Sequence, residues 1–139
     1  MKQLLTLLFL SFVALASVQS AGAETRLRTI MNELNMNTMK VVDGVMREDF
    51  ALIEAGATAI AEHEKAPMAE RKRIVGHLKE RASGFKGIDG ALHNDAVTVA
   101  EAARARDLEA VVEGLARIQR GCVACHTGFR QEVRQLFYK

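Results

Sequence analysis

Apolar residues recur with the period of an α-helix along almost the whole chain beyond residue 26. In each of four segments they fall at spacings of three and four, which places them on one side of a helix. The chain of 139 residues has ten glycines, one proline and only 5% aromatic residues, so it lacks the material for the turns and strands of an all-β fold. The pattern therefore predicts one all-α domain.

Three of the four segments have clear ends. The first runs from Leu27 to about Arg47. The second follows the capping residue Asp49 and ends before Pro67, because the residue ahead of a proline is pushed out of the helical region. The last follows a second capping residue, Asp107, and keeps its period almost to the end of the chain.

Glycines at positions 84, 87 and 90 interrupt the third segment. Each interior glycine costs roughly 0.5–1 kcal/mol relative to alanine. We therefore expect a short helix around 69–81, a bend, and a longer helix that ends at about Arg106. The glycines either mark a simple break or let the backbone approach something bulky.

Four helices with short connections favour an antiparallel up-down-up-down bundle, whose core is a common place for a cofactor. The formal net charge is +2, from 19 basic and 17 acidic residues. So balanced a charge does not produce the strong positive field that nucleic-acid binding requires. The composition therefore argues against a nucleic-acid partner.

Residues 1–23 have the character of a secretory signal peptide. Lys2 precedes a long apolar run, and Ala21-Gly22-Ala23 fits the small residues that signal peptidase prefers. An uncleaved membrane anchor is the alternative, but the run is shorter than the roughly 20 residues that cross a bilayer. We expect export to the periplasm and cleavage, with residues 24–139 as the mature four-helix-bundle domain.

One motif in the last helix carries specific chemistry. The only two cysteines lie in Cys122-Val123-Ala124-Cys125-His126, which is the C-x-x-C-H sequence at which c-type haem is attached. Positions i, i+3 and i+4 of a helix share one face, so both thiols and the imidazole would point the same way. The thiols would bond to the haem vinyl groups, and His126 would ligate the iron. A redox C-x-x-C or a short disulfide is the alternative, but its usual strand-helix-strand setting is missing.

The same stretch resembles the class II cytochromes c, which comprise cytochrome c′ and its six-coordinate, low-spin relatives. These proteins carry C-x-x-C-H followed by x-x-F/Y-R in their fourth helix, and here Thr127-Gly128-Phe129-Arg130 follows the motif. The resemblance implies a four-helix bundle with covalent haem near the end of the last helix and the distal residue on the first. It also implies a periplasmic electron carrier or gas binder. Two departures are the short connection between the second and third helices and the absence of tryptophan.

Helix geometry singles out Met31 as the sixth ligand of the iron. In an antiparallel bundle, at about 1.5 Å per residue, Met31 and Met36 lie near the level of His126. Met39 is about one turn away and Met46 is too far. At about 100° per residue, Met31 lies within the apolar stripe, whereas Met36 points away and Met39 is at the stripe's edge. The alternative is that Met31 only packs over the haem and leaves the iron five-coordinate.

Several other residues are weaker candidates. Arg130 lies four residues after His126 and either tunes the proximal side of the haem or is an ordinary exposed arginine. We expect His63 and His77 to be solvated among charged neighbours, whereas His93 could approach the haem. One basic segment is either a solvated helix face or a docking surface for an acidic redox partner. It consists of Arg71, Lys72, Arg73, Lys79, Arg81 and Lys86.

These features predict an exported c-type cytochrome that carries single electrons and is not an enzyme. One haem c would be held by Cys122 and Cys125, with His126 and Met31 as axial ligands of the iron. The alternative is a five-coordinate, cytochrome c′-like protein that binds NO or CO at an open distal face. As an electron carrier, the protein would have other redox proteins as partners and would make no contact with a membrane after signal cleavage. Pairing of two bundles through the first two helices is also open.

Overall fold

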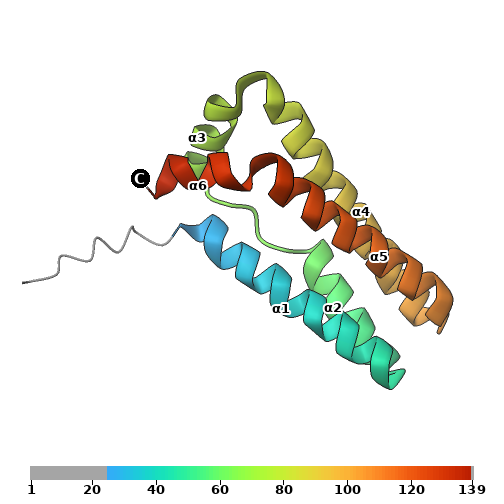
Figure 1. Cartoon of the computed structure of the whole chain (residues 1–139). Coiled ribbons are helices and arrows are strands. Elements are labelled where there is room, and N and C mark those ends of the chain that lie inside the picture. Colours follow the sequence, from blue (N-terminus) through green and yellow to red (C-terminus); the bar gives the residue numbers. More distant parts are fainter. Residues whose placement is uncertain (1–24, 139) are drawn as a thin grey trace, which may run out of the picture.

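The computed structural model of the chain describes residues 25–138, which form helices joined by short connections (Figure 1). These residues contain no strand, so the prediction of an all-α domain is confirmed. The predicted signal peptide, residues 1–23, lies outside the described residues. In order, the elements are α1 (Arg26–Arg47), α2 (Phe50–Ala61), α3 (Met68–Leu78), a 3₁₀ turn (Lys79–Arg81), α4 (Ala82–Arg104), α5 (Leu108–Cys125), a π-helical turn (His126–Arg130) and α6 (Gln131–Phe137).

Two helices, α2 and α5, follow the predicted capping residues. The carboxylate of Asp49 accepts a hydrogen bond from the backbone N–H of Leu52, with an N–O distance of 3.0 Å. Asp107 accepts the same bond from Ala110, also at 3.0 Å. Each of these caps satisfies a backbone donor that has no partner within the helix, and a cap of this kind contributes about 1 kcal/mol.

The predicted bend in the third segment is confirmed, but the glycines do not cause it. The chain turns at the 3₁₀ segment after α3, where Lys79 has a φ of 51°. α4 then continues through positions 84, 87 and 90 without interruption. A Cβ at Gly87 or Gly90 would have no neighbour within 4 Å, so these two glycines allow no close approach within the described residues.

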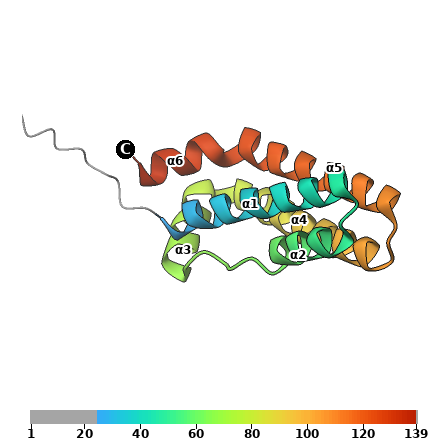
Figure 2. The ribbon, with the colours of Figure 1, turned by 90° about the horizontal axis from the view of Figure 1, so that it is seen from below.

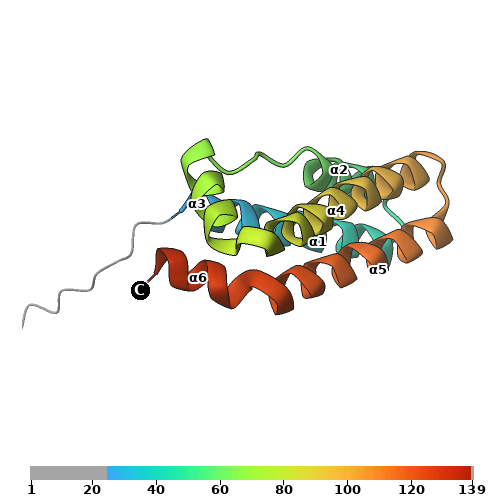
Figure 3. The ribbon, with the colours of Figure 1, turned by 90° about the horizontal axis from the view of Figure 1, so that it is seen from above.

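The helices form a bundle in which α1 packs on α2, α2 on α4, and α4 on α5, and α1 also contacts α5. Figures 2 and 3 show that α3, α6 and the beginning of α1 lie at the same end of the molecule. Within the described part of the chain, no helix has the length and apolar content needed to cross a membrane.

Buried apolar side chains of the described residues form two clusters. The main core joins α1, α2, α4 and α5, and the end cluster joins α3, α4 and the segment after Cys125. The largest fully buried side chains all belong to the main core: Ile30, Val41, Ile53, Ile60, Val99, Val111 and Ile118. The end cluster consists of Ile74, Leu78, Ala82, Phe129 and Val133. The buried apolar core of the bundle is therefore divided into two parts near one end of the molecule.

A glycine sets the distance between α1 and α2. A Cβ at Gly56 would lie 2.9 Å from the carbonyl oxygen of Asn37 and 2.9 Å from Cγ2 of Val41. Backbone atoms cannot give way as a flexible side chain can, so alanine at this position would push the two helices apart.

We expect Gly56→Ala to lower the free energy of unfolding by about 1–3 kcal/mol, because it overpacks the contact between α1 and α2. Gly90→Ala is the matched control, since Gly90 also lies inside a helix but faces open space. The control should raise the stability by about 0.5–1 kcal/mol through helix propensity. Urea titration followed by circular dichroism measures both values. Equal effects of the two substitutions would contradict the close approach of the helices.

Candidate functional site

The C-x-x-C-H motif lies where the last long helix changes its hydrogen-bonding pattern. α5 ends at Cys125, and His126 is the first residue of the π-helical turn His126–Arg130. Figure 1 shows the ribbon changing direction between α5 and α6 at this turn. π-Helical turns are rare in proteins, but those that occur are often found at functional sites. His126, the residue predicted to ligate iron, is therefore the first residue of a π-helical turn.

The π-helical turn is held from outside by Arg81 and Phe85. The guanidinium of Arg81 donates a hydrogen bond of 2.6 Å to the carbonyl oxygen of Gly128 and also pairs with Glu132. It lies 5.0 Å from the ring centroid of Phe129. The Phe129 ring is buried and meets the ring of Phe85 edge to face, with centroids 5.5 Å apart. Contacts with residues more than forty positions away thus stabilise the turn.

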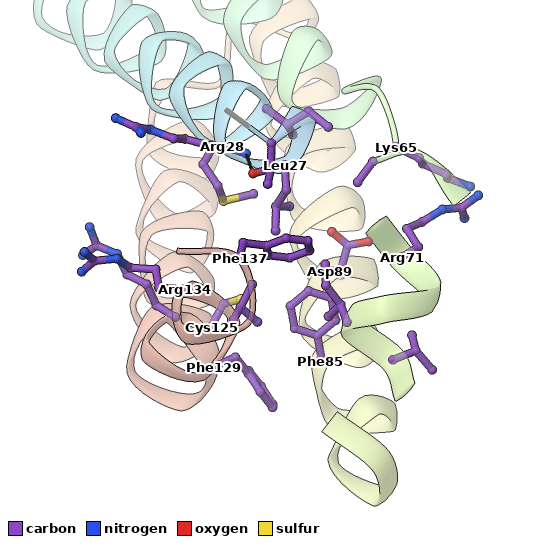
Figure 4. Close-up of a pocket in the computed structure, with 18 of the residues that line it drawn as sticks. Leu27, Arg28, Lys65, Arg71, Phe85, Asp89, Cys125, Phe129, Arg134 and Phe137 are labelled. Atoms are coloured by element: carbon purple, nitrogen blue, oxygen red, sulfur yellow. Dashed lines mark hydrogen bonds between the residues drawn. The ribbon is translucent and has the colours of Figure 1, made fainter. Parts of the chain in front are cut away.

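A large cavity opens beside this turn (Figure 4). Its volume is about 1390 Å³, which exceeds the roughly 300–1,000 Å³ of common small-molecule pockets. Much of the wall is apolar, with contributions from Leu27, Ile30, Ile74, Val75, Phe85, Ile88, Phe129, Val133 and Phe137. The cavity lies where the two clusters separate, because Ile30 belongs to the main core and Ile74, Phe129 and Val133 to the end cluster.

Most of the predicted haem-binding residues line this cavity. Met31 reaches it from α1, and Cys125, His126 and Arg130 reach it from the end of α5 and the π-helical turn. Cys122 is not part of the wall: it is half-buried against the main core, whereas Cys125 packs on the end cluster. The two cysteines therefore lie on either side of the division between the clusters.

The surroundings of both thiols favour the protonated form. Burial raises the pKa of Cys122 and is also the main reason that the pKa of Cys125 is raised. For Cys125, the negative charge of Asp89 and the neighbouring Cys122 raise the pKa further. No disulfide joins the two residues. The Cys125 thiol, at the wall of a mostly apolar cavity, fits the addition of S–H across a vinyl group, and Cys122 lies three residues before it on the same helix.

Among the methionines of α1, the structure brings one to the cavity. Met31 is 37% exposed and lines the wall, whereas Met36 and Met39 are 58% exposed and Met46 is 79% exposed, all three outside it. These positions agree with the choice of Met31, which is based on its height along the first helix and its angle around the helix axis. Sequence reasoning missed Met68, which lines the cavity from the beginning of α3. No periodic pattern leads up to Met68, so the sequence carries no signal of its position.

The prediction that His63 is solvated is wrong. Its side chain is only 13% exposed and lines the cavity. Nδ1 lies 2.8 Å from the carbonyl oxygen of Ile60, and Nε2 lies 3.8 Å from the carboxylate of Asp89. A carbonyl can only accept, so Nδ1 carries the proton and donates it to Ile60. His63 was misjudged because its charged sequence neighbours do not reveal that the chain after α2 folds back over the cavity.

The other two histidines lie away from the cavity wall. His77 is exposed, as predicted, and its Nε2 lies 3.6 Å from the carboxylate of Glu132. His93 is exposed on α4. Among the described residues, no three His, Cys, Asp or Glu side chains gather to hold a bare metal ion. A haem iron differs in this respect, since the porphyrin supplies most of its ligands and the protein adds one or two.

Comparison of the chain with protein-family profiles, with curated proteins and with solved structures finds no match. The interpretation of the site therefore depends on its own residues and geometry.

We expect Arg81→Ala to lower the free energy of unfolding by about 1 kcal/mol, because it removes a charge-assisted hydrogen bond to a backbone carbonyl and an ion pair. The matched control is Arg47→Ala, whose guanidinium pairs, among residues 25–138, only with Asp43 one turn away on the same exposed helix face. Its loss should cost about 0.3–0.5 kcal/mol. Urea titration of the two variants measures the difference. A smaller loss for Arg81→Ala than for the control would show that Arg81 does not hold the turn.

Proposed function

We propose that the protein is an exported c-type cytochrome that carries single electrons, with one haem c in the cavity. One observation carries this proposal: a C-x-x-C-H sequence whose Cys125 and His126 line a large, mostly apolar cavity that Met31 also lines. The resemblance of Cys122 to Arg130 to the class II cytochromes c supports the same conclusion. When bound, the haem supplies an iron that gains and loses one electron. The signal-like sequence of residues 1–23 supports export.

We also propose the antiparallel up-down-up-down order for the long helices. Two residues connect α1 to α2, and three residues, 105–107, connect α4 to α5. Connections this short support antiparallel neighbours. In this arrangement the beginning of α1 lies beside the end of α5, which is consistent with the shared position of Met31 and His126 in one cavity wall.

The two cysteines would anchor the haem by thioether bonds. Because Cys122 packs on the main core and Cys125 on the end cluster, the two bonds would tie both clusters to one rigid group. His126 would ligate the iron from the α5 side. Arg130, also in the cavity wall, would place a positive charge near the proximal side.

Met31 would close the opposite side of the iron. A thioether ligand there excludes small gases and limits the structural change that accompanies electron transfer. The apolar wall, which includes Ile30 and Phe137, would keep water away from the iron. The second candidate is a five-coordinate protein that binds NO or CO at an open distal face. In that case Met31 would pack over the haem without ligating it.

The first test concerns the covalent bonds. After extraction with acidified acetone, we expect the haem colour to stay with the polypeptide, because thioethers resist this treatment. The variant with Cys122→Ala and Cys125→Ala should yield no holoprotein. The control His77→Ala alters an exposed residue outside the cavity wall and should keep its haem. Haem that passes into the acetone would contradict the proposal.

The second test concerns the sixth ligand. We expect the unmutated protein to be low-spin in both oxidation states, and Met31→Ala to give a high-spin spectrum and rapid CO binding. Met39→Ala is a control on the same helix, and Met68→Ala is a control at the cavity wall. Both should leave the spectrum nearly unchanged. An unmutated protein that is already high-spin and binds CO at once would favour the gas-binding candidate.

A further inference from the structure

Exposed cations surround the mouth of the cavity. Seven basic side chains and two acidic ones, Glu64 and Asp89, line it, which leaves a net charge of +5 without the histidines. The whole chain carries only +2, so the rest of the chain has a net charge of −3. Figure 4 shows Arg28 and Arg134 on one side of the cavity and Lys65 and Arg71 on the other. We call the seven residues the cationic rim: Arg28, Lys65, Arg71, Lys72, Lys86, Arg130 and Arg134.

The charges of the cationic rim are available to a partner. All seven side chains are exposed, and none forms a salt bridge with another residue of the described chain. Glu64 already pairs with Arg26, which lies outside the rim. Arg81, Arg104 and Arg117 differ from the rim residues, because each of them pairs with a carboxylate. Salt bridges within the part of the chain that the structure describes therefore do not cancel the positive charge at the cavity mouth.

The cationic rim differs from the basic segment that the sequence suggested. Arg73 donates to the carbonyl oxygen of Leu136 at 3.2 Å and lies 4.5 Å from the ring centroid of Phe137, so it serves the packing of α3 on α6. Arg81 donates its hydrogen bond to a backbone carbonyl oxygen of the π-helical turn and so stabilises that turn. The rim instead gains cations from α1, the π-helical turn and α6, which are far apart in the sequence.

Haem alone would not neutralise this rim. A haem carries two propionate carboxylates, so a net charge of about +3 would remain at the mouth even if both propionates contacted the rim. Positive charge around the mouth of a redox site attracts negatively charged partners and orients them as they approach. It also leads them to the mouth of the cavity that would hold the haem.

We propose that the cationic rim docks the carboxylate-rich face of a partner redox protein over the cavity mouth. The role in electron transfer depends on the proposed function, whereas the binding of an acidic chain does not. An anionic membrane surface is the competing occupant. The proposal favours a protein because the cations encircle a concave site, and a flat bilayer would reach only the outermost of them.

The test uses poly-L-glutamate as the acidic probe and isothermal titration calorimetry of the full holoprotein. The rim variant combines Lys65→Gln, Lys72→Gln and Lys86→Gln. Its control combines Lys40→Gln, Lys79→Gln and Arg120→Gln, which remove the same charge at exposed positions outside the cavity wall. We expect the rim variant to bind roughly threefold to a hundredfold more weakly and the control to bind within about twofold of the unmutated protein. Equal weakening in both variants would overturn the proposal.

Two further measurements separate the possible outcomes. Bound poly-L-glutamate should slow reduction of the ferric protein by ascorbate, and salt that shortens the Debye length below about 10 Å should remove this effect. Vesicles of phosphatidylglycerol that bind more tightly than poly-L-glutamate would overturn the proposal in favour of a membrane. If the purified full-length protein lacks haem, the proposed function fails, and the same calorimetry on that haem-free protein still tests whether the cationic rim binds poly-L-glutamate. If haem is bound but both variants bind alike, the rim proposal alone fails.

Discussion

The division of the buried apolar side chains into two clusters is the constraint on which the rest of the structure depends. Ile30 marks the edge of the main core, and Ile74 and Phe129 mark the edge of the end cluster. Other apolar side chains that line the intervening cavity, such as Leu27, Ile88 and Phe137, are only partly buried, so each lacks packing contacts on one side. A flat, rigid, apolar group that fills this space would restore the contacts and join the two ends of the bundle.

The chemistry of the site follows from where the motif falls on this boundary. Cys122 belongs to one cluster and Cys125 to the other, and His126 begins the π-helical turn that brings the following residues toward α3 and α4. Packing, covalent attachment and iron ligation would thus meet within one stretch of helix. The cations lie around the mouth of the cavity, so the same fold combines a mostly apolar wall with a positively charged entrance.

Much of this arrangement could be predicted from the sequence, because local signals dominate it. The helices follow from apolar periodicity and from caps at Asp49 and Asp107, and the position of Met31 follows from rise and rotation along one helix. The π-helical turn His126–Arg130 could not be predicted, because contacts with distant residues hold it. His63 was misplaced for the same reason: it follows α2 in a stretch without periodicity, so only the tertiary fold sets its environment.

We propose that the chain carries one covalently attached haem at the C-x-x-C-H motif. Intact-mass spectrometry under denaturing conditions tests it most directly, on protein exported by a host that matures c-type cytochromes. We expect a polypeptide that begins near Glu24 and is heavier than its sequence by the mass of one haem, with the addition located on the peptide that contains Cys122 and Cys125. A folded, exported protein with the mass of the unmodified polypeptide would contradict the account.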